Sequence, residues 1–484
     1  MKTIKNNFVL LIFCLSFATG FSQEFKTQSS EVFRKESNEQ NFQIAFASPY
    51  GFMVYSELEG HRMVNGGVNT IKLSTFDQSM QRVGTQNFEL PMLGNRPADL
   101  RKIVEQENQL VFLSSAMNTK SGEHNLYAQV YSKTDNAVGQ TKILGTFPIE
   151  KYSRSGAYQI AVSPDRSKIA VFANMPFDRK SKEKVKIWLF GEQLNLLWKQ
   201  TAPLQFDSER AYREKIFVTN SGQVFLEKVT DFEKRSKMAY LLKFDGSSSE
   251  KTTFSAEKFF PMEMALVNVE GKPMLAGFFW DGDEAIIQMN EDEGEENDGA
   301  FLYDLSQKKL IGKHLFPAKR QSNVDDGKID YNSMKSLKVV DVKSIDGNIY
   351  LTGEKQLRKS EFRNDGSMEI DYFYTFGPAV IANLDTQGTL KDFAPFFYST
   401  NYKNSNENGS LAVLDFNKGL RVFSNYKKNG RYDLDTVFAE EKVSYGDPEG
   451  YNILPSTVKR VDNYNLIYYL TNTGNGYYLN KMTW

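Results

Sequence analysis

The chain has 484 residues and a formal net charge of −1, which gives no support for a nucleic-acid partner or an anionic membrane surface. Aromatic residues make up 13% of it and there are only 14 prolines, so a disordered or linker-rich protein is excluded. This length is enough to bury a sizeable core without disulfides.

The N-terminus has the pattern of a cleavable signal peptide. Two lysines precede an apolar run over 8–17, and the small residues Gly20 and Ser22 follow it. The run is shorter than the ~20 residues that a membrane-spanning helix needs. The sequence therefore predicts a signal peptide over 1–22 and an exported mature chain that begins at Gln23, in the periplasm or outside the cell.

The only cysteine, Cys14, lies inside this predicted signal peptide. Phe13 before it is too large for the small position that a lipidation signal requires. The mature chain is therefore expected to have no disulfide, no lipid and no cysteine metal ligand. Removal of the two signal-peptide lysines leaves 57 basic and 60 acidic side chains, a net charge of −3.

From residue 42 onward, short segments with period-2 alternation end at Gly, Asn, Asp or Ser, which is typical of β-strands. A strand, a tight turn and a second apolar strand recur at the scale of one propeller blade. We therefore predict an all-β fold, a single β-propeller over 23–484 with about eight four-stranded blades, and seven as the alternative. The turns that mark the units are Tyr50-Gly51, Asn108-Gln109, Arg166-Ser167, Ser221-Gly222, Gly271-Lys272, Gly347-Asn348, Lys418-Gly419 and Asn463-Tyr464. The unit around 411–455 lacks a clear third and fourth strand, which is why seven blades stay open.

A second polar turn follows the third strand of most units. It contains Asp, which can bond to its own backbone, and in places Gly, which tolerates positive φ. These turns begin at Phe76-Asp77, Tyr131-Ser132, Phe244-Asp245, Tyr303-Asp304 and Leu384-Asp385. Two hairpins per unit predict a four-stranded antiparallel sheet.

The last unit ends one strand short. The segment 24–35 alternates weakly and precedes the first full unit, so we expect it to pair with the C-terminal unit and close the ring. The aromatic C-terminus, Trp484, leaves an outer-membrane β-barrel as a second alternative, although strands such as 169–172 are apolar on both faces and argue against it.

The segment 163–171 (SPDRSKIAV) resembles the S-P-D-G-x-x-[IL]-[AV] element of TolB-like and WD40-like propeller repeats. In that element the Pro-Asp pair makes the turn and the apolar run is the second strand. We place Ser167 at the position where the element usually has Gly. The Gly-His and Trp-Asp pairs of the WD40 repeat proper do not recur from unit to unit. The resemblance implies a propeller and no particular function.

Motifs for catalysis and metal binding are sparse. His61, His124 and His314 are far apart, and a lone histidine in a loop is usually solvated, although His61 and His124 fall in equivalent predicted loops. The sequence has no G-x-S-x-G elbow and no phosphate-binding loop. The acidic run over 281–298 has enough oxygens for Ca²⁺, but its spacing departs from the usual loop pattern, so we favour a solvated acidic loop and predict no cofactor.

Long loops are expected on one face of the propeller, where the second strand joins the third and each blade joins the next. The insertions are 57–69, 281–300, 317–336, 355–374 and 398–410, and the tight turns lie on the opposite face, expected to be inert. We predict a non-catalytic propeller that binds a protein or a glycan of the cell envelope through this loop-rich face. The candidate binding residues are Trp280, Asp281, Asp283, Glu284, His61 and His124.

Two questions stay open at this stage. A polysaccharide hydrolase or lyase with carboxylates gathered at the central channel is the main alternative function, and raised carboxyl pKa values at the channel mouth would favour it. The aromatic segment Phe278, Phe279 and Trp280 beside the acidic run would suit a carbohydrate or a basic peptide, provided that one phenylalanine points outward. The sequence does not indicate the ligand or the oligomeric state.

Overall fold

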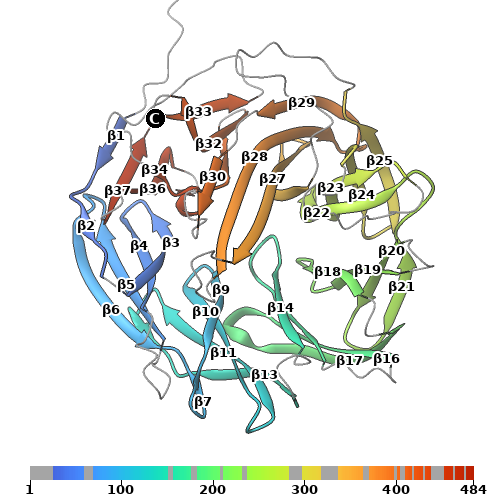
Figure 1. Cartoon of the computed structure of the whole chain (residues 1–484), viewed down its shortest axis with the longest axis horizontal. Coiled ribbons are helices and arrows are strands. Elements are labelled where there is room, and N and C mark those ends of the chain that lie inside the picture. The colour runs from blue at the N-terminus through green and yellow to red at the C-terminus, as the bar shows by residue number, and fades with distance from the viewer. Residues whose placement is uncertain are drawn as a thin grey trace, which may run out of the picture.

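The computed structural model shows strands arranged radially around a centre (Figure 1). The residues that it describes are 26–36, 38–58, 69–150, 156–175, 182–207, 211–231, 237–282, 297–317, 336–362, 370–396, 400–403, 409–416, 419–428, 431–437, 452–461, 464–473 and 476–483.

Each sheet is antiparallel, and in most of them successive strands of the chain are neighbours. Blade 1 contains β3 (Glu39–Ser48), β4 (Gly51–Leu58), β5 (Thr70–Asp77) and β6 (Arg82–Glu89). Blade 2 contains β9 (Asp99–Glu105), β10 (Gln109–Asn118) and β11 (Glu123–Ser132), with β12 (Ala137–Val138) and β13 (Lys142–Pro148) along its outer edge. The small hairpin of β7 (Met92–Leu93) and β8 (Arg96–Pro97) connects these two blades.

Blades 3 to 6 follow in the same order. Blade 3 contains β14 (Ala157–Val162), β15 (Ile169–Asn174), β16 (Lys182–Phe190) and β17 (Leu196–Asp207). Blade 4 contains β18 (Ala211–Val218), β19 (Val224–Asp231), β20 (Lys237–Phe244) and β21 (Ser249–Thr253). Blade 5 contains β22 (Phe260–Val269), β23 (Lys272–Trp280), β24 (Gly299–Asp304) and β25 (Lys309–Leu315). Blade 6 contains β26 (Leu337–Ile345), β27 (Asn348–Phe362), β28 (Ile370–Asp385) and β29 (Leu390–Phe396), with β30 (Thr400–Lys403) beside β28.

The ring is completed by a three-stranded sheet and a closing blade. The three-stranded sheet contains β31 (Leu411–Phe416), β32 (Gly419–Lys428) and β33 (Arg431–Val437). The closing blade contains β34 (Asn452–Ile453), β35 (Lys459–Arg460), β36 (Leu466–Asn472) and β37 (Gly476–Thr483), with β1 (Lys26–Ser29) and β2 (Phe33–Arg34) on its outer edge.

The all-β propeller is confirmed, and its blade count is the alternative that we gave. Seven sheets in the described part of the chain have four or more strands, namely blades 1 to 6 and the closing blade. The expected eight four-stranded blades are not supported, because β31–β33 has only three strands among the described residues. The sequence signal had already weakened in this unit.

The two ends of the chain close the ring, as the sequence predicted. Strand β1 pairs with β37 from Lys26 opposite Thr483 to Ser29 opposite Asn480, and β2 pairs with the start of the same strand. The ring of Phe33 lies 5.7 Å from that of Tyr477, centroid to centroid, so the N-terminal segment also packs against the closing blade. This pairing covers an edge that would otherwise be open.

The core lies between neighbouring sheets rather than at the centre of the ring. Eight apolar clusters each join two neighbours, so a strand has apolar residues on both of its faces. Phe278 and Phe279 show this directly: both are buried, the first toward blade 6 and the second toward blade 4. The aromatic segment that we proposed as an exposed patch is therefore core packing.

The polar turns after the third strands form as expected. Oδ1 of Asp77 accepts hydrogen bonds from the backbone N–H groups of Ser79 and Gln81, at 2.9 Å each. The aspartates that close the same turn in blades 4, 5 and 6 bond in the same manner: Asp245, Asp304 and Asp385. Asp recurs at this position because its short side chain brings a carboxylate close to the N–H groups of the turn, which lack backbone acceptors.

The turn at 163–168 corrects one detail of the sequence interpretation. Arg166, and not Ser167, has the positive φ of +60° that Gly tolerates best. The side chain of Asp165 holds the turn by accepting bonds from Ser163 Oγ at 2.5 Å and from the N–H of Ser167 at 3.0 Å. Arg166 therefore occupies a left-handed position with a large side chain.

Helices contribute little to the described structure. The described helical segments are two short 3₁₀ turns, η2 (Glu192–Leu194) and η4 (Pro455–Thr457). Neither these nor any other helix among the described residues has the length and apolar character to cross a membrane.

Candidate functional site

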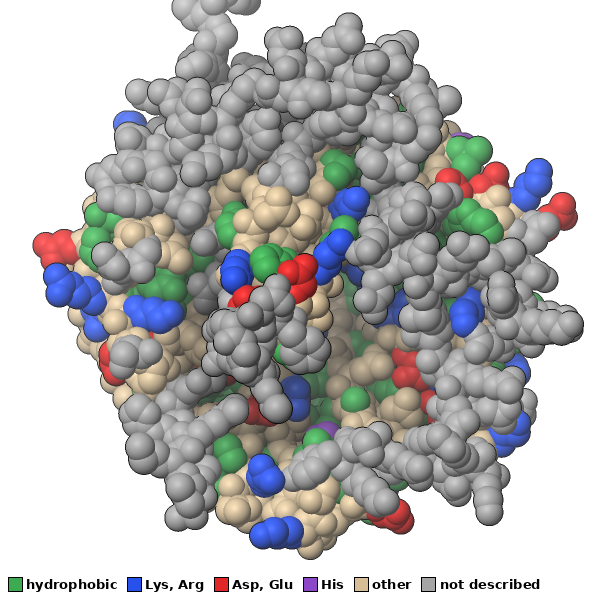
Figure 2. All heavy atoms as spheres, in the orientation of Figure 1, with side chains coloured by type: hydrophobic (Ala, Val, Ile, Leu, Met, Phe, Trp, Pro, Cys, Tyr) green, Lys and Arg blue, Asp and Glu red, His purple; other side chains and the backbone are tan. Residues whose placement is uncertain are grey.

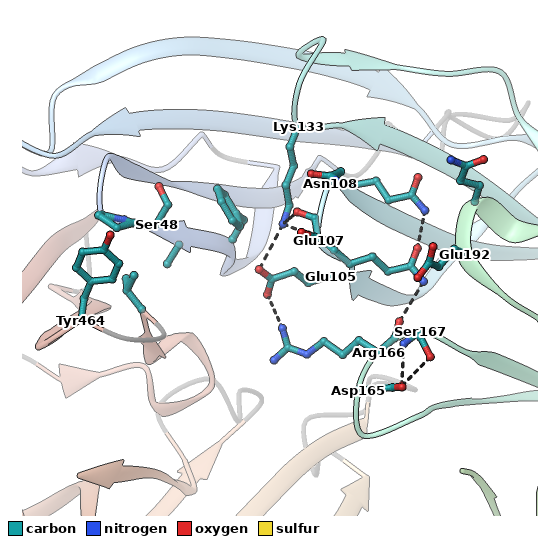
Figure 3. A pocket seen from close by; sticks show the side chains of 17 residues that line it. Ser48, Glu105, Glu107, Asn108, Lys133, Asp165, Arg166, Ser167, Glu192 and Tyr464 are labelled. Atoms are coloured by element: carbon teal, nitrogen blue, oxygen red, sulfur yellow. Dashed lines mark hydrogen bonds and ion pairs between the residues drawn. The ribbon is translucent and has the colours of Figure 1, made fainter. Parts of the chain in front are cut away.

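A cavity of about 500 Å³ opens among the tight turns of four blades (Figure 3). Its walls come from the β3–β4 turn of blade 1, the β9–β10 turn of blade 2, the β14–β15 turn and η2 of blade 3, and the β35–β36 connection of the closing blade. This volume is within the range of small-ligand sites. The tight-turn face, which we expected to be inert, therefore carries a candidate site.

Glu105, the last residue of β9, lies among three cationic side chains. Its Oε2 is 3.1 Å from Nη1 of Arg166 and 3.5 Å from Nζ of Lys459, and its Oε1 is 3.5 Å from Nζ of Lys133. Lys459 belongs to the closing blade and Arg166 to blade 3. One carboxylate thus links three blades, and the lining of the cavity also carries the carboxylates of Asp165, Glu107 and Glu192.

Lys133 is the most enclosed of these cations. Its ammonium donates to the backbone oxygens of Gln106 at 2.9 Å and Glu107 at 3.2 Å, and it lies 3.8 Å from the centroid of the Phe46 ring. Burial lowers the pKa of Lys133, although Glu105 opposes this shift. Its three donors are engaged by the β9–β10 turn and Glu105, so it fixes this wall of the cavity.

Arg166 has more capacity for a ligand. Its side chain is 55% exposed, and one N–H group of the guanidinium contacts Glu105. Its backbone is held in place, since the carbonyl accepts a bond from Nε2 of Gln106 at 3.1 Å and the N–H of Asp165 donates to Oδ1 of Asn220 at 3.1 Å. Partial burial raises the pKa of Asp165, but hydrogen bonds from Ser163 and Ser167 outweigh this effect and hold the pKa below its usual value. The turn that presents Arg166 is therefore rigid.

The opposite wall carries an aromatic ring and hydroxyl groups. Tyr464 and Ser48 lie together on the side of the cavity that faces Glu105 and Arg166 (Figure 3). The side chain of Tyr464 is 48% exposed. Glu192 lies across the cavity from Tyr464 (Figure 3), and both it and Glu107 are exposed. The cavity therefore combines one aromatic face with hydrogen-bonding and charged groups.

A second group of charges lies at the other end of the strands, near the loop-rich face. Lys228 of β19 is fully buried and contacts Glu183 of β16, with 2.6 Å between Nζ and Oε2, and Glu214 of β18. The pKa of Glu183 is raised to about 7, chiefly by burial. The nearby Glu214 also raises this pKa, whereas the positive charge of Lys228 opposes the rise. These three side chains tie blade 3 to blade 4.

Similar pairs connect blades 4, 5 and 6. Glu227 is buried against Arg213, with 2.6 Å between Oε1 and Nη2, and burial raises the pKa of Glu227. Arg213 also donates to the backbone oxygen of Pro261, at 2.8 Å. Glu263 lies 3.3 Å from Lys215 and 2.5 Å from Lys338. Figure 2 shows one face of the molecule, hollowed near its centre, with side chains of both charges around the hollow.

The structure places only part of the residue set that the sequence predicted. His61, Asp283 and Glu284 lie outside the described residues. Trp280 ends β23 and packs, partly buried, against the apolar cluster between blades 4 and 5. Asp281 follows it, and its carboxylate lies 3.6 Å from Nζ of Lys313 while its N–H donates to Oδ2 of Asp298 at 2.7 Å.

The sequence had indicated that His124 lies in a loop, but the structure places it in a strand. It lies in β11, is 4% exposed, and packs edge-on against Phe147 and Tyr158. Burial, with a smaller effect of Arg101, lowers the pKa of His124 to about 4. The histidine is therefore a neutral packing residue between blades 2 and 3, and the predicted role in binding has no exposed surface to support it.

Among the described residues, no group of three or more His, Cys, Asp or Glu side chains is arranged to hold a metal ion. Most of the acidic run, 283–296, lies outside the described part of the chain.

No protein-family model matches the sequence, and no curated protein matches it. Solved structures that it resembles include the β-propeller domain of the Trilobed protease from Pyrococcus furiosus, at 12% identity over 86% of this chain and 98% of that one, with a TM-score of 0.39. The polysaccharide lyase Uly1 is 10% identical over 79% and 89% of the two chains, with a TM-score of 0.37. The WD40 domain of SCAP from fission yeast is 8% identical over 95% and 98%, with a TM-score of 0.34.

These likenesses concern the fold alone, because a propeller hosts many unrelated functions. The TolB-like assignment of the segment 163–171 has no match that supports it.

Proposed function

We propose that this chain is an exported, non-catalytic β-propeller that binds a protein or a glycan in the cell envelope, and that the cavity among its tight turns is a binding site. The observation that carries the proposal is the cavity itself. It offers an exposed guanidinium, exposed carboxylates and an aromatic ring around about 500 Å³. Sites of this size with a few placed polar groups are the usual form of ligand pockets.

Export is supported by the signal-peptide pattern, which lies outside the described residues. The intact mass of the protein recovered from the envelope tests it. We expect a chain that begins at Gln23 and carries no acyl group. A mass that includes Cys14 with attached lipid would contradict this.

The loop-rich face stays a second proposed surface for a partner. Of its insertions, the parts 59–68, 283–296, 318–335, 363–369, 398–399 and 404–408 lie outside the described residues. Trp280 and Asp281 are the candidate binding residues beside these insertions that the structure describes.

Binding at the cavity is tested with two tryptophan variants of the mature chain. Asn108→Trp puts bulk into the cavity from an exposed turn position, and Lys272→Trp is a control at an exposed position of the corresponding turn of blade 5. Both variants and the parent are incubated with a glycan array and with purified envelope proteins. We expect one class of glycan or protein to bind the parent and to be recovered with unchanged mass. This ligand should no longer bind Asn108→Trp, and it should still bind Lys272→Trp. Equal behaviour of the two variants would refute the site, and shortened glycans would refute the non-catalytic assignment.

One observation favours the alternative of a polysaccharide hydrolase or lyase. Glu183 and Glu214 lie close together around Lys228, and the raised pKa of Glu183 is a property that a general acid needs near neutral pH. The same group also joins two blades, which is reason enough for it to be buried. Incubation with a panel of polysaccharides decides between these roles. Shortened products that disappear with Glu183→Gln and persist with Asn108→Trp would support the enzyme.

A further inference from the structure

The charged side chains that line the cavity are of both signs. They are Glu105, Glu107, Asp165, Glu192, Lys133 and Arg166. Four carboxylates against two cations give the lining a net charge of −2, or −1 if Lys459, which contacts Glu105 from outside the lining, is counted as well. The exposed carboxylates and the half-exposed guanidinium share one cavity, so a charged ligand of either sign meets like charges in it. The lining therefore favours an uncharged ligand.

The walls also present amide groups. Asn108 and Gln193 are exposed, and Gln109 is partly exposed beside them. Nε2 of Gln109 donates to Oε1 of Gln106 at 2.5 Å, and Nε2 of Gln106 donates to the carbonyl of Arg166 at 3.1 Å, so two of the amides form a fixed chain along the wall. Each primary amide has both donors and an acceptor. A ligand for this wall must therefore donate and accept hydrogen bonds at closely spaced positions.

A hydroxyl group meets this requirement, because it has one donor, two acceptor lone pairs and no charge. It can donate to the exposed carboxylates of Glu107 and Glu192 and accept from the exposed N–H groups of Arg166. An ammonium group can make only the first kind of bond, and a carboxylate only the second. A neutral sugar carries several hydroxyl groups on one ring, whereas a peptide backbone has one N–H and one C=O per residue. The dense polar lining therefore favours a sugar over a peptide.

The opposite wall offers a surface for the apolar face of a sugar ring. Tyr464 is 48% exposed and lies across the cavity from Glu192, with Ser48 beside it (Figure 3). A tyrosine has an apolar ring and a polar tip, so it suits a ligand that has an apolar face and polar edges. An aromatic wall that faces a wall of amides and carboxylates matches both parts of a sugar ring.

We infer that the cavity binds an uncharged sugar unit of a glycan, with the apolar face of its ring against Tyr464 and its hydroxyl groups on Glu107, Glu192 and Arg166. This inference rests on the proposed function, since it names the ligand of the same cavity. It selects glycan over protein and a neutral sugar over a charged one.

The experiment measures affinity by calorimetry for short oligomers of neutral hexoses and pentoses. The comparison ligands are uronic-acid oligomers, glucosamine oligomers with free amino groups, and a hexapeptide of lysine. Each titration is made at about 0.05 M and about 0.5 M salt, because added salt screens interactions between exposed charges.

The proteins are the mature chain, Tyr464→Ala, Tyr464→Phe, Glu192→Ala and a control, Tyr50→Ala. Tyr50 is 82% exposed in the β3–β4 turn and does not line the cavity. Thermal unfolding of each variant shows that it is folded.

We expect at least one neutral oligomer to bind, with an affinity that changes less than about 2-fold between the two salt concentrations. Tyr464→Ala should weaken this binding about 3- to 10-fold, and Tyr464→Phe, which keeps the ring, should retain most of it. Glu192→Ala should weaken it about 10-fold through the loss of a hydrogen bond. Tyr50→Ala should bind like the parent.

The inference is overturned if no neutral oligomer binds, if a charged oligomer or the peptide binds more tightly than every neutral one, or if Tyr50→Ala weakens binding as much as Tyr464→Ala. The proposed function survives these results where a glycan or a protein binds and Asn108→Trp abolishes that binding. It fails when neither glycan nor protein binding depends on the cavity.

Discussion

Replacement of Arg166 by glycine should leave the protein as stable as before, although an ion pair is lost. Arg166 has a φ of +60°, and a left-handed conformation costs a residue with a Cβ about 1–2 kcal/mol. Glycine removes this cost. It also gives the unfolded chain more freedom, worth about 0.4–1 kcal/mol, and it removes the half-exposed contact with Glu105, worth about 0.2–1 kcal/mol. The free energy of unfolding therefore changes by between about −1 and +1.4 kcal/mol, where a positive value means a more stable protein.

Two further variants make this prediction specific. Arg166→Ala keeps the Cβ in the left-handed position, so it should be less stable than Arg166→Gly by up to about 1.6 kcal/mol, the reverse of the usual order of alanine and glycine. Ser167→Gly should destabilise by about 1–2.5 kcal/mol, because Ser167 Oγ donates to Asp165 at 2.9 Å and the residue has no positive φ.

The assay is calorimetric melting together with urea unfolding of the mature chain and the three variants. In a protein of this size, 1 kcal/mol corresponds to roughly 2–4 °C or less. Arg166→Gly should therefore melt within about 3 °C of the parent and above both other variants. The reasoning is refuted if Arg166→Ala is at least as stable as Arg166→Gly, or if Ser167→Gly is the more stable of the two glycine variants.

Three other predictions concern the ring, the buried carboxylates and the loop-rich face. Deletion of 24–35 removes β1 and β2 and uncovers the edge of β37, so the melting temperature should fall or the protein should aggregate; unchanged melting would contradict ring closure. Because the pKa of Glu183 rises from 4.5 to about 7 on folding, its contribution to stability is largest below pH 4.5 and falls as the pH rises toward 7, by up to about 3 kcal/mol; urea unfolding of Glu183→Gln should lack this fall. Neutralising Asp281, Asp283 and Glu284 together should weaken capture of an envelope partner, and the loss of the Asp281 contact with Lys313 should cost less than about 1 kcal/mol; intact capture would contradict a role for this face.

The sequence predicted those parts of the fold that depend on neighbours in the chain. Tight turns and Asp turns are local, so their residues marked the hairpins: Asp77 bonds to the N–H groups that follow it within four residues. Ring closure was also predictable, because a missing strand at one end and a spare strand at the other are visible in the pattern. The number of blades was not, since the unit after blade 6 lacks the local signals.

The cavity could not be predicted, because its residues meet only in three dimensions. Glu105 and Lys459 are separated by 354 positions and belong to blades that are not consecutive. Each looks like an ordinary surface charge in the sequence. His124 failed for the opposite reason: a polar residue near a polar loop was interpreted as solvated, whereas the strand continues through it and buries it. The one local signal for the site was Arg166, where a turn element usually has glycine, and we had placed the exception one residue too late.

The cavity depends on the closure of the ring, which connects the fold to the proposed function. Tyr464 and Lys459 come from the closing blade, whose outer edge is formed by β1, whereas Ser48 comes from blade 1 and Glu105 from blade 2. If β1 leaves β37, the closing blade loses its edge strand and the contact of Phe33 with Tyr477. The aromatic wall and one of the three cations then lose their support, while Glu105, Lys133 and Arg166 keep theirs. A chain with an open ring should therefore retain the positive turn of blade 3 and lose the cavity, so binding and ring closure should fail together.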